Sequence, residues 1–377
     1  MRKFILQISI FTFPILLFLG IMLIIIYRSG EFFNFPDKLI LSNENYLIGK
    51  HHDKHIYPLK WREIILNQKR EIIVLGTSRV MAFRQEMFKK PFYNAGYTIS
   101  NISDYRQFLL NMPKKKFPST ILIGLDQRMF RYNDSYSMPL KISREKDYWN
   151  EYQILPDLNY LMSFFNKVIY FEYDLKIILD HLLGKNTDNR IGFDAILNNT
   201  GFRKDGSYNF FREIKSAQAI DSNFIEEKFS KNFTDIKNGR HIFGFAKSVN
   251  RDAIFELKQL IQYCDKNDIY VIAIVNPYPE SIKNLIKNNY NFLYIDKIVS
   301  RVKESITNEN YEIWDSNQLN HFNMNDDEFI DGIHGIEVTA IKTLLSIAKE
   351  KSRLTELIDT KKLNNDLKKR KNSYLVY

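Results

Sequence analysis

The strongest constraint that this sequence places on structure is a run of 24 residues without a charged side chain, from Phe4 to Tyr27. As an α-helix this run would be about 36 Å long, enough to cross a hydrocarbon core of about 30 Å. Arg2 and Lys3 precede it, so the positive-inside rule predicts a cytoplasmic N-terminus and an external remainder. A cleaved signal peptide is the alternative, but its apolar region normally has only about 7–15 residues. We therefore expect a single-pass membrane anchor.

The composition limits the compartment and the partners. Cys264 is the only cysteine, so neither an intramolecular disulfide nor a cysteine-based metal site is expected. An external chain without disulfides is usual in bacteria, which predicts a bacterial cytoplasmic membrane with the larger part of the chain in the periplasm or outside the cell. The net charge of +10 would suit nucleic acid. The external location argues against nucleic acid, and no nucleic-acid partner is expected.

Two clusters of charged or metal-binding residue types have open interpretations. His51, His52 and His55 could form a metal site, although short surface histidine runs are often incidental, and no metal or other cofactor is expected. Residues 351–377 are rich in lysine and read as a basic C-terminal tail. Such a tail is either solvated or in contact with anionic lipid or polymer.

Short apolar runs alternate with helical patterns over much of the chain, which predicts a doubly wound parallel sheet in an α/β domain. The predicted strands are residues 71–75, 92–94, 120–125, 269–275 and 311–314. The predicted helices are residues 80–89, a helix beginning near Ser103, residues 175–183, 251–267, 280–307 and 335–350.

The same patterns suggest a domain organisation. Residues 1–28 would be the anchor, 29–69 a juxtamembrane segment and 70–350 the α/β domain. Residues 127–247 break the strand–helix rhythm and are rich in Tyr, Phe and Asn, so they read as a large, partly helical insertion.

A candidate nucleophile follows the first predicted strand, in Gly76-Thr77-Ser78-Arg79. A serine between a buried strand and a helix has an exposed hydroxyl, but it is a poor nucleophile without a base. A simple helix N-cap is the alternative role for Ser78. Arg79 could hold an anionic substrate group or pair with a nearby carboxylate.

The matching base candidate lies near the other end of the domain, in Asp331-Gly332-Ile333-His334. This spacing lets Asp331 hold one ring nitrogen of His334 while the other nitrogen faces Ser78, which is the arrangement of a nucleophile–base–orienter triad. Asp331 as a helix cap and His334 as a surface residue are the alternatives.

Backbone and amide donors at other strand ends could complete such a site. Gly96 follows the second predicted strand, where its N–H could face a developing oxyanion together with the N–H of Ser78. A simple turn glycine is the alternative. Asn276 ends the strand at 269–275 and could be a substitute amide donor or merely a strand terminator.

Four short blocks together resemble the SGNH/GDSL hydrolase superfamily, and within it the membrane-anchored branch that includes DltD-like and alginate O-acetylation proteins. The blocks are Gly76-Thr77-Ser78, Asn94-Ala95-Gly96, Gly124-Leu125-Asp126 and Asp331-Gly332-Ile333-His334. The resemblance implies an SGNH-like, flavodoxin-like fold, with Ser78 as nucleophile, His334 as base, Asp331 as its orienter and Gly96 as an oxyanion donor.

One position departs from the superfamily. Its third block usually ends in Gly-x-Asn-Asp, whose Asn donates to the oxyanion, whereas this chain has Asp126 after Gly124-Leu125. An ionised Asp126 would repel an oxyanion, so it would help only if protonated or turned away.

The sequence therefore suggests an external serine esterase or O-acyltransferase that acts on acyl groups of cell-envelope polysaccharide. A membrane-bound O-acyltransferase partner is implied by the resemblance alone. The alternatives are a catalytically weak or inactive subunit that binds a glycan or a partner, and a purely structural envelope component.

Overall fold

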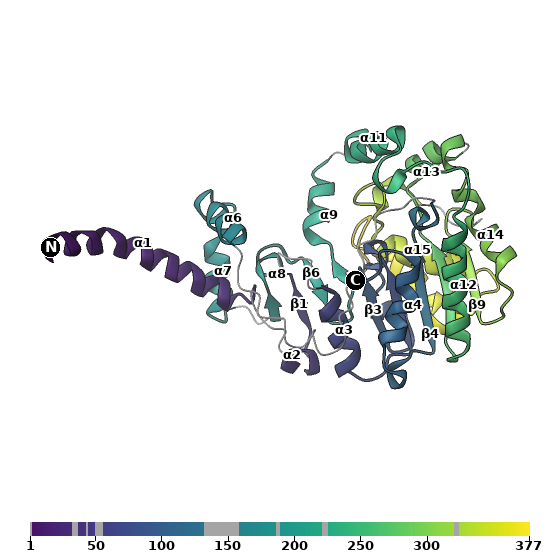
Figure 1. The fold of residues 1–377 in the computed structure, drawn as a ribbon, viewed down its shortest axis with the longest axis horizontal. Coiled ribbons are helices and arrows are strands. Elements are labelled where there is room, and N and C mark those ends of the chain that lie inside the picture. Colours follow the sequence, from purple (N-terminus) through teal and green to yellow (C-terminus); the bar gives the residue numbers. More distant parts are fainter. Residues whose placement is uncertain are drawn as a thin grey trace. The chain divides into compact units, whose positions relative to one another are not determined.

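The computed structural model describes residues 2–31, 37–42, 44–49, 56–131, 158–185, 189–220, 225–287, 289–319 and 324–377. The chain divides into two compact units (Figure 1), an N-terminal unit of Met1–His55 with Ile142–Lys204 and a C-terminal unit of Ile56–Lys141 with Asp205–Tyr377. The region expected to be one insertion is thus divided between the two units. His51, His52 and His55 lie outside the described residues.

The N-terminal unit begins with helix α1, Arg2–Arg28. Among the described residues it is the one helix that is long and apolar enough to cross a membrane, which confirms that part of the anchor prediction. The orientation of the chain stays a prediction. The other elements are α2 (Asp37–Leu41), β1 (Tyr46–Ile48), α6 (Leu158–Ile169), α7 (Leu175–Leu182), β5 (Asn189–Ile191), α8 (Phe193–Asn198) and β6 (Gly201–Arg203). Strand β1 pairs in parallel with β5 and antiparallel with β6.

The C-terminal unit is built on a five-stranded parallel sheet in the order β3-β2-β4-β8-β9. Its strands are β2 (Ile72–Gly76), β3 (Phe92–Gly96), β4 (Thr120–Leu125), β8 (Tyr270–Val275) and β9 (Tyr311–Asp315). All five predicted strands are therefore confirmed, as is the α/β class. The chain moves from β2 to β3 on one side and then to β4 on the other, so the order reverses between β2 and β4. Ligands of open parallel sheets bind at such a reversal, beyond the carboxyl ends of the strands.

Alternate side chains of the strands enter two separate cores. Ile73 and Leu75 of β2 pack with Tyr105 and Phe108 of α4 (Ile102–Asn111) on one face. Helices α3 (Ile56–Leu66) and α12 (Arg251–Asp265) contribute to the same core. Ile72 and Val74 pack on the opposite face against α15 (Glu337–Ala348). Continuous apolar strands are needed because both faces are covered.

The helix expected at residues 80–89 is wrong. The segment forms two 3₁₀ turns, η2 (Ser78–Val80) and η3 (Gln85–Met87). The buried side-chain amide of Asn94 donates to the carbonyls of Val80 and Phe83, both at 2.8 Å. The Val80 carbonyl also accepts from the backbone N–H of Phe83 at 3.2 Å. The Asn94 contacts are tertiary, and local sequence does not reveal them.

The remaining elements of the C-terminal unit are helical, apart from one short strand. They are η4 (Lys114–Lys116), η5 (Gln127–Phe130), β7 (Tyr208–Asn209), α9 (Phe211–Gln218), α10 (Ile225–Lys228), α11 (Ser230–Asn238), η6 (His241–Phe243), α13 (Glu280–Ile286), η7 (Tyr290–Phe292), η8 (Ile295–Lys297), α14 (Ile298–Ser305), η9 (Asp326–Glu328), α16 (Leu354–Leu357) and α17 (Thr360–Lys368).

Residues 351–377 are not the expected solvated tail. Leu354, Leu363 and Val376 are buried in the core beneath α15. The backbone N–H groups of Val376 and Tyr377 each donate to the Glu337 carboxylate at 2.9 Å. The segment contains many lysines but also a few apolar side chains. These apolar side chains pack the segment against the rest of the C-terminal unit.

Candidate active site

Three aligned glycines at the strand ends make room for the turn that carries Ser78. Gly76, Gly96 and Gly124 are aligned on neighbouring strands β2, β3 and β4. A Cβ at Gly124 would lie 2.1 Å from Val80, and one at Gly96 would lie 2.7 Å from the same side chain. Only glycine lets Val80 approach the strand ends this closely. The turn that carries Ser78 is thereby held directly over the reversal between β2 and β4.

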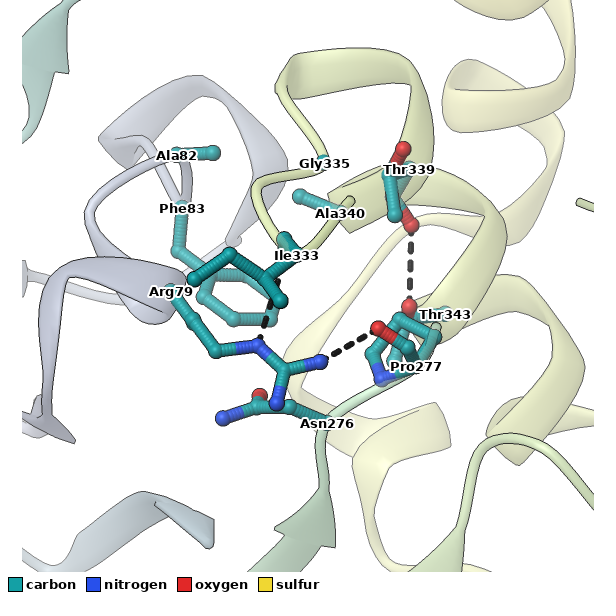
Figure 2. A pocket seen from close by; sticks show the side chains of 10 residues that line it. All are labelled: Arg79, Ala82, Phe83, Asn276, Pro277, Ile333, Gly335, Thr339, Ala340 and Thr343. Carbon is teal, nitrogen blue, oxygen red and sulfur yellow. Dashed lines mark hydrogen bonds between the residues drawn. The ribbon is translucent and has the colours of Figure 1, made fainter. Parts of the chain in front are cut away.

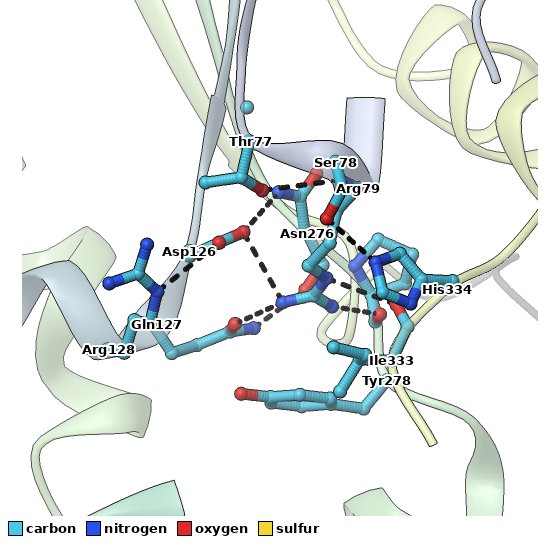
Figure 3. Close-up of polar contacts among 12 residues, drawn as sticks. Thr77, Ser78, Arg79, Asp126, Gln127, Arg128, Asn276, Tyr278, Ile333 and His334 are labelled. Atoms are coloured by element: carbon cyan, nitrogen blue, oxygen red, sulfur yellow. Dashed lines mark hydrogen bonds and ion pairs between the residues drawn. The ribbon is translucent and has the colours of Figure 1, made fainter. Parts of the chain in front are cut away.

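Ser78, His334 and Asp331 meet at this edge of the sheet although 253 positions separate Ser78 from Asp331 in the sequence. The hydroxyl oxygen of Ser78 lies 2.7 Å from Nε2 of His334, and Nδ1 of His334 lies 2.8 Å from the Asp331 carboxylate. The Ser78–His334 contact is drawn in Figure 3. An ionised carboxylate only accepts, so Nδ1 carries a proton and Nε2 is left to accept from Ser78. The three residues that the sequence singled out are thus brought together in the predicted order.

Backbone hydrogen bonds hold the Asp331 carboxylate in the position from which it contacts the imidazole of His334. Its second carboxylate oxygen accepts from the backbone N–H of Ile333 at 2.9 Å and of His334 at 2.8 Å. Burial alone would raise the pKa of Asp331, but the charge of His334 and these hydrogen bonds outweigh it and lower the pKa to about 2. Asp331 is therefore ionised at any pH at which an imidazole can act as a base.

Ser78 does not cap the turn that it begins. The N-cap is Thr77, whose hydroxyl accepts from the backbone N–H of Arg79 at 3.3 Å. The Ser78 side chain is directed to His334. The backbone N–H of Ser78 has no acceptor within the part of the chain that the structure describes. It is available as an oxyanion donor.

The N–H of Gly96 is engaged in this structure. It donates to the side-chain oxygen of Asn94 at 2.8 Å, and Asn94 is itself buried. The predicted oxyanion role of Gly96 requires that this bond be given up. The signal for this arrangement is in the second block itself, because the Asn two residues before the glycine supplies the acceptor.

Asp126 lies at the end of β4, beside the pocket of Ser78, but its carboxylate is not isolated. It accepts from the Asn276 amide at 2.8 Å and lies 3.6 Å from Arg79 and 3.7 Å from Arg128. Two guanidinium groups therefore balance its charge. Asn276 is buried, and one of its two amide hydrogens is committed to Asp126.

The side chain of Arg79 is buried and joins several segments of the chain. Figures 2 and 3 show its contacts. Its guanidinium donates to the carbonyls of Ile333 and Pro277 and to the side chain of Gln127 at 2.9 Å. It also lies 4.8 Å from the ring of Tyr278. Of the two roles considered for Arg79, the structure shows the carboxylate pair. A narrow pocket lies behind Arg79, lined in part by Arg79, Phe83 and Ile333.

An open pocket of about 750 Å³ lies in front of Ser78. Its wall combines apolar side chains with cationic ones and includes Arg128, His241, Ile242, Tyr278 and Ile333. Sequence reasoning missed Arg128 and Tyr278. Each stands two residues after Asp126 or Asn276 at a strand end, which is the one signal that could have found them. His241 is exposed and pairs with Asp235 at 3.8 Å.

Comparisons with protein-family models, with curated proteins and with solved structures found no match to this chain.

Proposed function

We propose that this protein is a membrane-anchored serine esterase or O-acyltransferase that acts on acyl groups of cell-envelope polysaccharide. The observation that carries the proposal is the chain of two short contacts, from Ser78 to Nε2 of His334 and from Nδ1 of His334 to Asp331. Ser78 lies on the turn after β2, whereas Asp331 and His334 lie together on the loop before α15. A serine–imidazole–carboxylate chain between these two segments has few purely structural uses.

The SGNH-like fold and membership of the anchored branch belong to the same proposal. The strand order, renumbered along the chain, is 2-1-3-4-5, the flavodoxin-like order. The serine follows the first strand, and the Asp-x-x-His block precedes the last long helix, as the resemblance requires. An anchor helix at the N-terminus supports a substrate at the membrane surface, and a membrane-bound O-acyltransferase would be a natural partner.

The proposed chemistry needs only residues of this chain. His334 Nε2 takes the Ser78 proton as the serine oxygen attacks the acyl carbonyl carbon. The tetrahedral oxyanion accepts from the Ser78 N–H. His334 then returns the proton to the departing alcohol, which leaves an acyl-serine. Water or a sugar hydroxyl, deprotonated in turn by His334, then attacks the acyl carbon. The bond to Ser78 breaks, His334 returns the proton to the Ser78 oxygen, and the acyl group leaves as an acid or as a new ester.

The pocket in front of Ser78 supports a small acyl group beside a polar acceptor. Ile242, Ile333 and Tyr278 offer apolar contact for the acyl chain, while Arg128 places a cationic group in the same pocket wall.

A fluorophosphonate probe tests the proposal on the full-length protein in detergent. The wild type should be labelled covalently at Ser78, and Ser78→Ala should not be labelled. Ser119→Ala is a matched control, because the Ser119 hydroxyl donates to the Glu71 carbonyl at 3.0 Å at the opposite edge of the sheet. Absence of labelling in folded wild-type protein would overturn the enzyme proposal.

A second candidate is a glycan- or partner-binding subunit without turnover. It is favoured by the oxyanion side of the site, where the Gly96 N–H is occupied by Asn94 and a carboxylate, Asp126, replaces the usual amide. A protein that the fluorophosphonate probe does not label, but that still binds acylated polysaccharide, would support this alternative.

A further inference from the structure

An apolar surface outside α1 is concentrated in one short stretch of the N-terminal unit. Of the fourteen exposed large hydrophobic side chains found beyond α1 in the described residues, seven lie between residues 162 and 183. They include Met162, Ile169, Tyr170, Phe171, Leu179 and Leu183. These residues lie on α6, on α7 with its C-cap Leu183, and on the turn between the two helices. We call this stretch the α6–α7 hairpin. Exposed apolar side chains gathered in this way mark a contact surface.

The turn of the hairpin has a feature that water alone does not explain. Phe171 is 90% exposed and has a left-handed backbone, with φ of 57°. A bulky residue rarely adopts this conformation, and an aromatic ring gains nothing from full exposure to water. An apolar or interfacial environment around the ring would remove one of these two costs.

The hairpin packs on the C-terminal turns of α1. Met22, Ile25 and Ile26 of α1 share a core with Phe164, Val168 and Ile178 of the hairpin. The rings of Phe18 and Phe165 lie 6.2 Å apart between their centroids. Figure 1 shows α6 and α7 beside this end of α1.

The length of α1 sets the depth of this contact. Its 27 residues make a helix of about 40 Å, which exceeds a hydrocarbon core of about 30 Å by roughly 10 Å. With Lys3 at one boundary, the core ends near Leu23. Phe18 then lies about 7 Å inside the core, and Ile25 and Ile26 lie at the level of the headgroups. Amphipathic helices bind membranes at this depth.

We propose that the α6–α7 hairpin is a second membrane-binding element, which lies in the boundary where α1 leaves the bilayer and contacts lipid directly. The proposal rests on α1 crossing the membrane and is independent of the chemistry at Ser78. An exposed lysine favours lipid over a protein partner, because Lys176 stands among the apolar residues of the hairpin, whereas Lys185 pairs with Asp180 at 2.6 Å. Lysine is depleted in buried protein interfaces, whereas at a membrane its stem lies along the apolar surface and its ammonium reaches the headgroups.

Spin labels on single cysteines test this proposal in the full-length chain, reconstituted in phosphatidylcholine–phosphatidylglycerol liposomes. The native Cys264 does not interfere, because burial raises its pKa to about 12 and keeps its thiol unreactive. Labels are placed at Phe171→Cys and Leu183→Cys. Ile15→Cys in α1 is the lipid reference, and Phe255→Cys is a matched water reference, since Phe255 is an exposed aromatic residue of α12.

The ratio of collision rates with oxygen and with a water-soluble nickel complex reports depth. We expect this ratio at positions 171 and 183 to be several-fold higher than at position 255 and lower than at position 15, which lies about 12 Å deeper in the core. A water-exposed label at both hairpin positions with a lipid-exposed label at position 15 would overturn the proposal and leave the anchor intact. Labels shielded from both reagents would indicate contact with protein, a second copy included, and would also overturn it. Water exposure at position 15 would overturn the anchor and the hairpin together.

Discussion

The two sides of the Ser78 site are built differently. On one side Ser78, His334 and Asp331 are joined by contacts of 2.7 and 2.8 Å, and each polar atom faces the partner that proton transfer requires. On the other side Gly96, Asp126 and Asn276 are already bonded to protein groups. The first side holds a continuous chain of proton donors and acceptors. On the oxyanion side, the Ser78 N–H is a donor that has no acceptor among the described residues. The proposed esterase activity therefore rests on the Ser78–His334–Asp331 side of the site.

The largest expected effect breaks the triad side. Ser78→Ala and His334→Ala should each lower probe labelling and esterase activity about a thousandfold or more, and the double variant should lose little beyond either one. The reason is that serine and imidazole act as one unit. Single- and double-variant rates on a small acyl ester measure this, and fully additive losses would contradict it. The melting temperature should change little, because neither side chain fills the core.

Arg79→Ala should have the largest effect on stability. It removes a buried cation that pairs with Asp126 and binds the loops of Ile333 and Pro277. Breaking a buried pair from one side costs about 3–5 kcal/mol. Urea unfolding of the variant measures the loss of free energy of unfolding. Arg301→Ala is the control, since the exposed Arg301–Glu304 pair contributes at most about 1 kcal/mol. Equal losses in both variants would contradict this expectation.

Asp126→Asn sharpens the comparison from the oxyanion side. The change leaves Arg79 and Arg128 without their shared carboxylate, so we expect a loss of about 1–3 kcal/mol in the free energy of unfolding. It also replaces a negative charge by a neutral amide near the developing oxyanion. Labelling of Ser78, measured per folded molecule, should therefore rise a few-fold. A fall in labelling at unchanged folding would mean that the Asp126 charge assists the reaction.

The smallest expected effect concerns pH. The pKa of Asp331 is lowered from 3.8 to about 2 in the folded chain, so its stabilising contribution is complete above about pH 4 and is lost as the pH falls toward 2. Melting temperatures between pH 5 and 2 should therefore fall less steeply for Asp331→Asn than for the wild type. Parallel curves would show that the hydrogen bonds to Asp331 do not favour its ionised form.

Much of the C-terminal unit was determined by the sequence alone. Strands such as Thr120–Leu125 were predicted because both faces of a parallel sheet are covered, which forces an unbroken apolar run. Ser78, Asp331 and His334 were identifiable because their residue types and their places beside strand and helix ends are local properties. The apolar span of α1 was equally plain, since membrane crossing depends on length and composition.

Only the tertiary structure decided how the other groups of the site are used. The side-chain amide of Asn94 donates to the carbonyls of Val80 and Phe83, and residues 80–89 form turns where a helix was expected. Arg79, 47 positions before Asp126, joins the neighbouring Arg128 at the Asp126 carboxylate, and this removes the isolated charge that the sequence suggested. The basic C-terminal segment packs on the core through a few apolar residues, leucines among them, that stand between lysines in the sequence. In each case the outcome depends on a partner distant along the chain, because hydrogen bonds and ion pairs are satisfied in space and leave no period in the sequence.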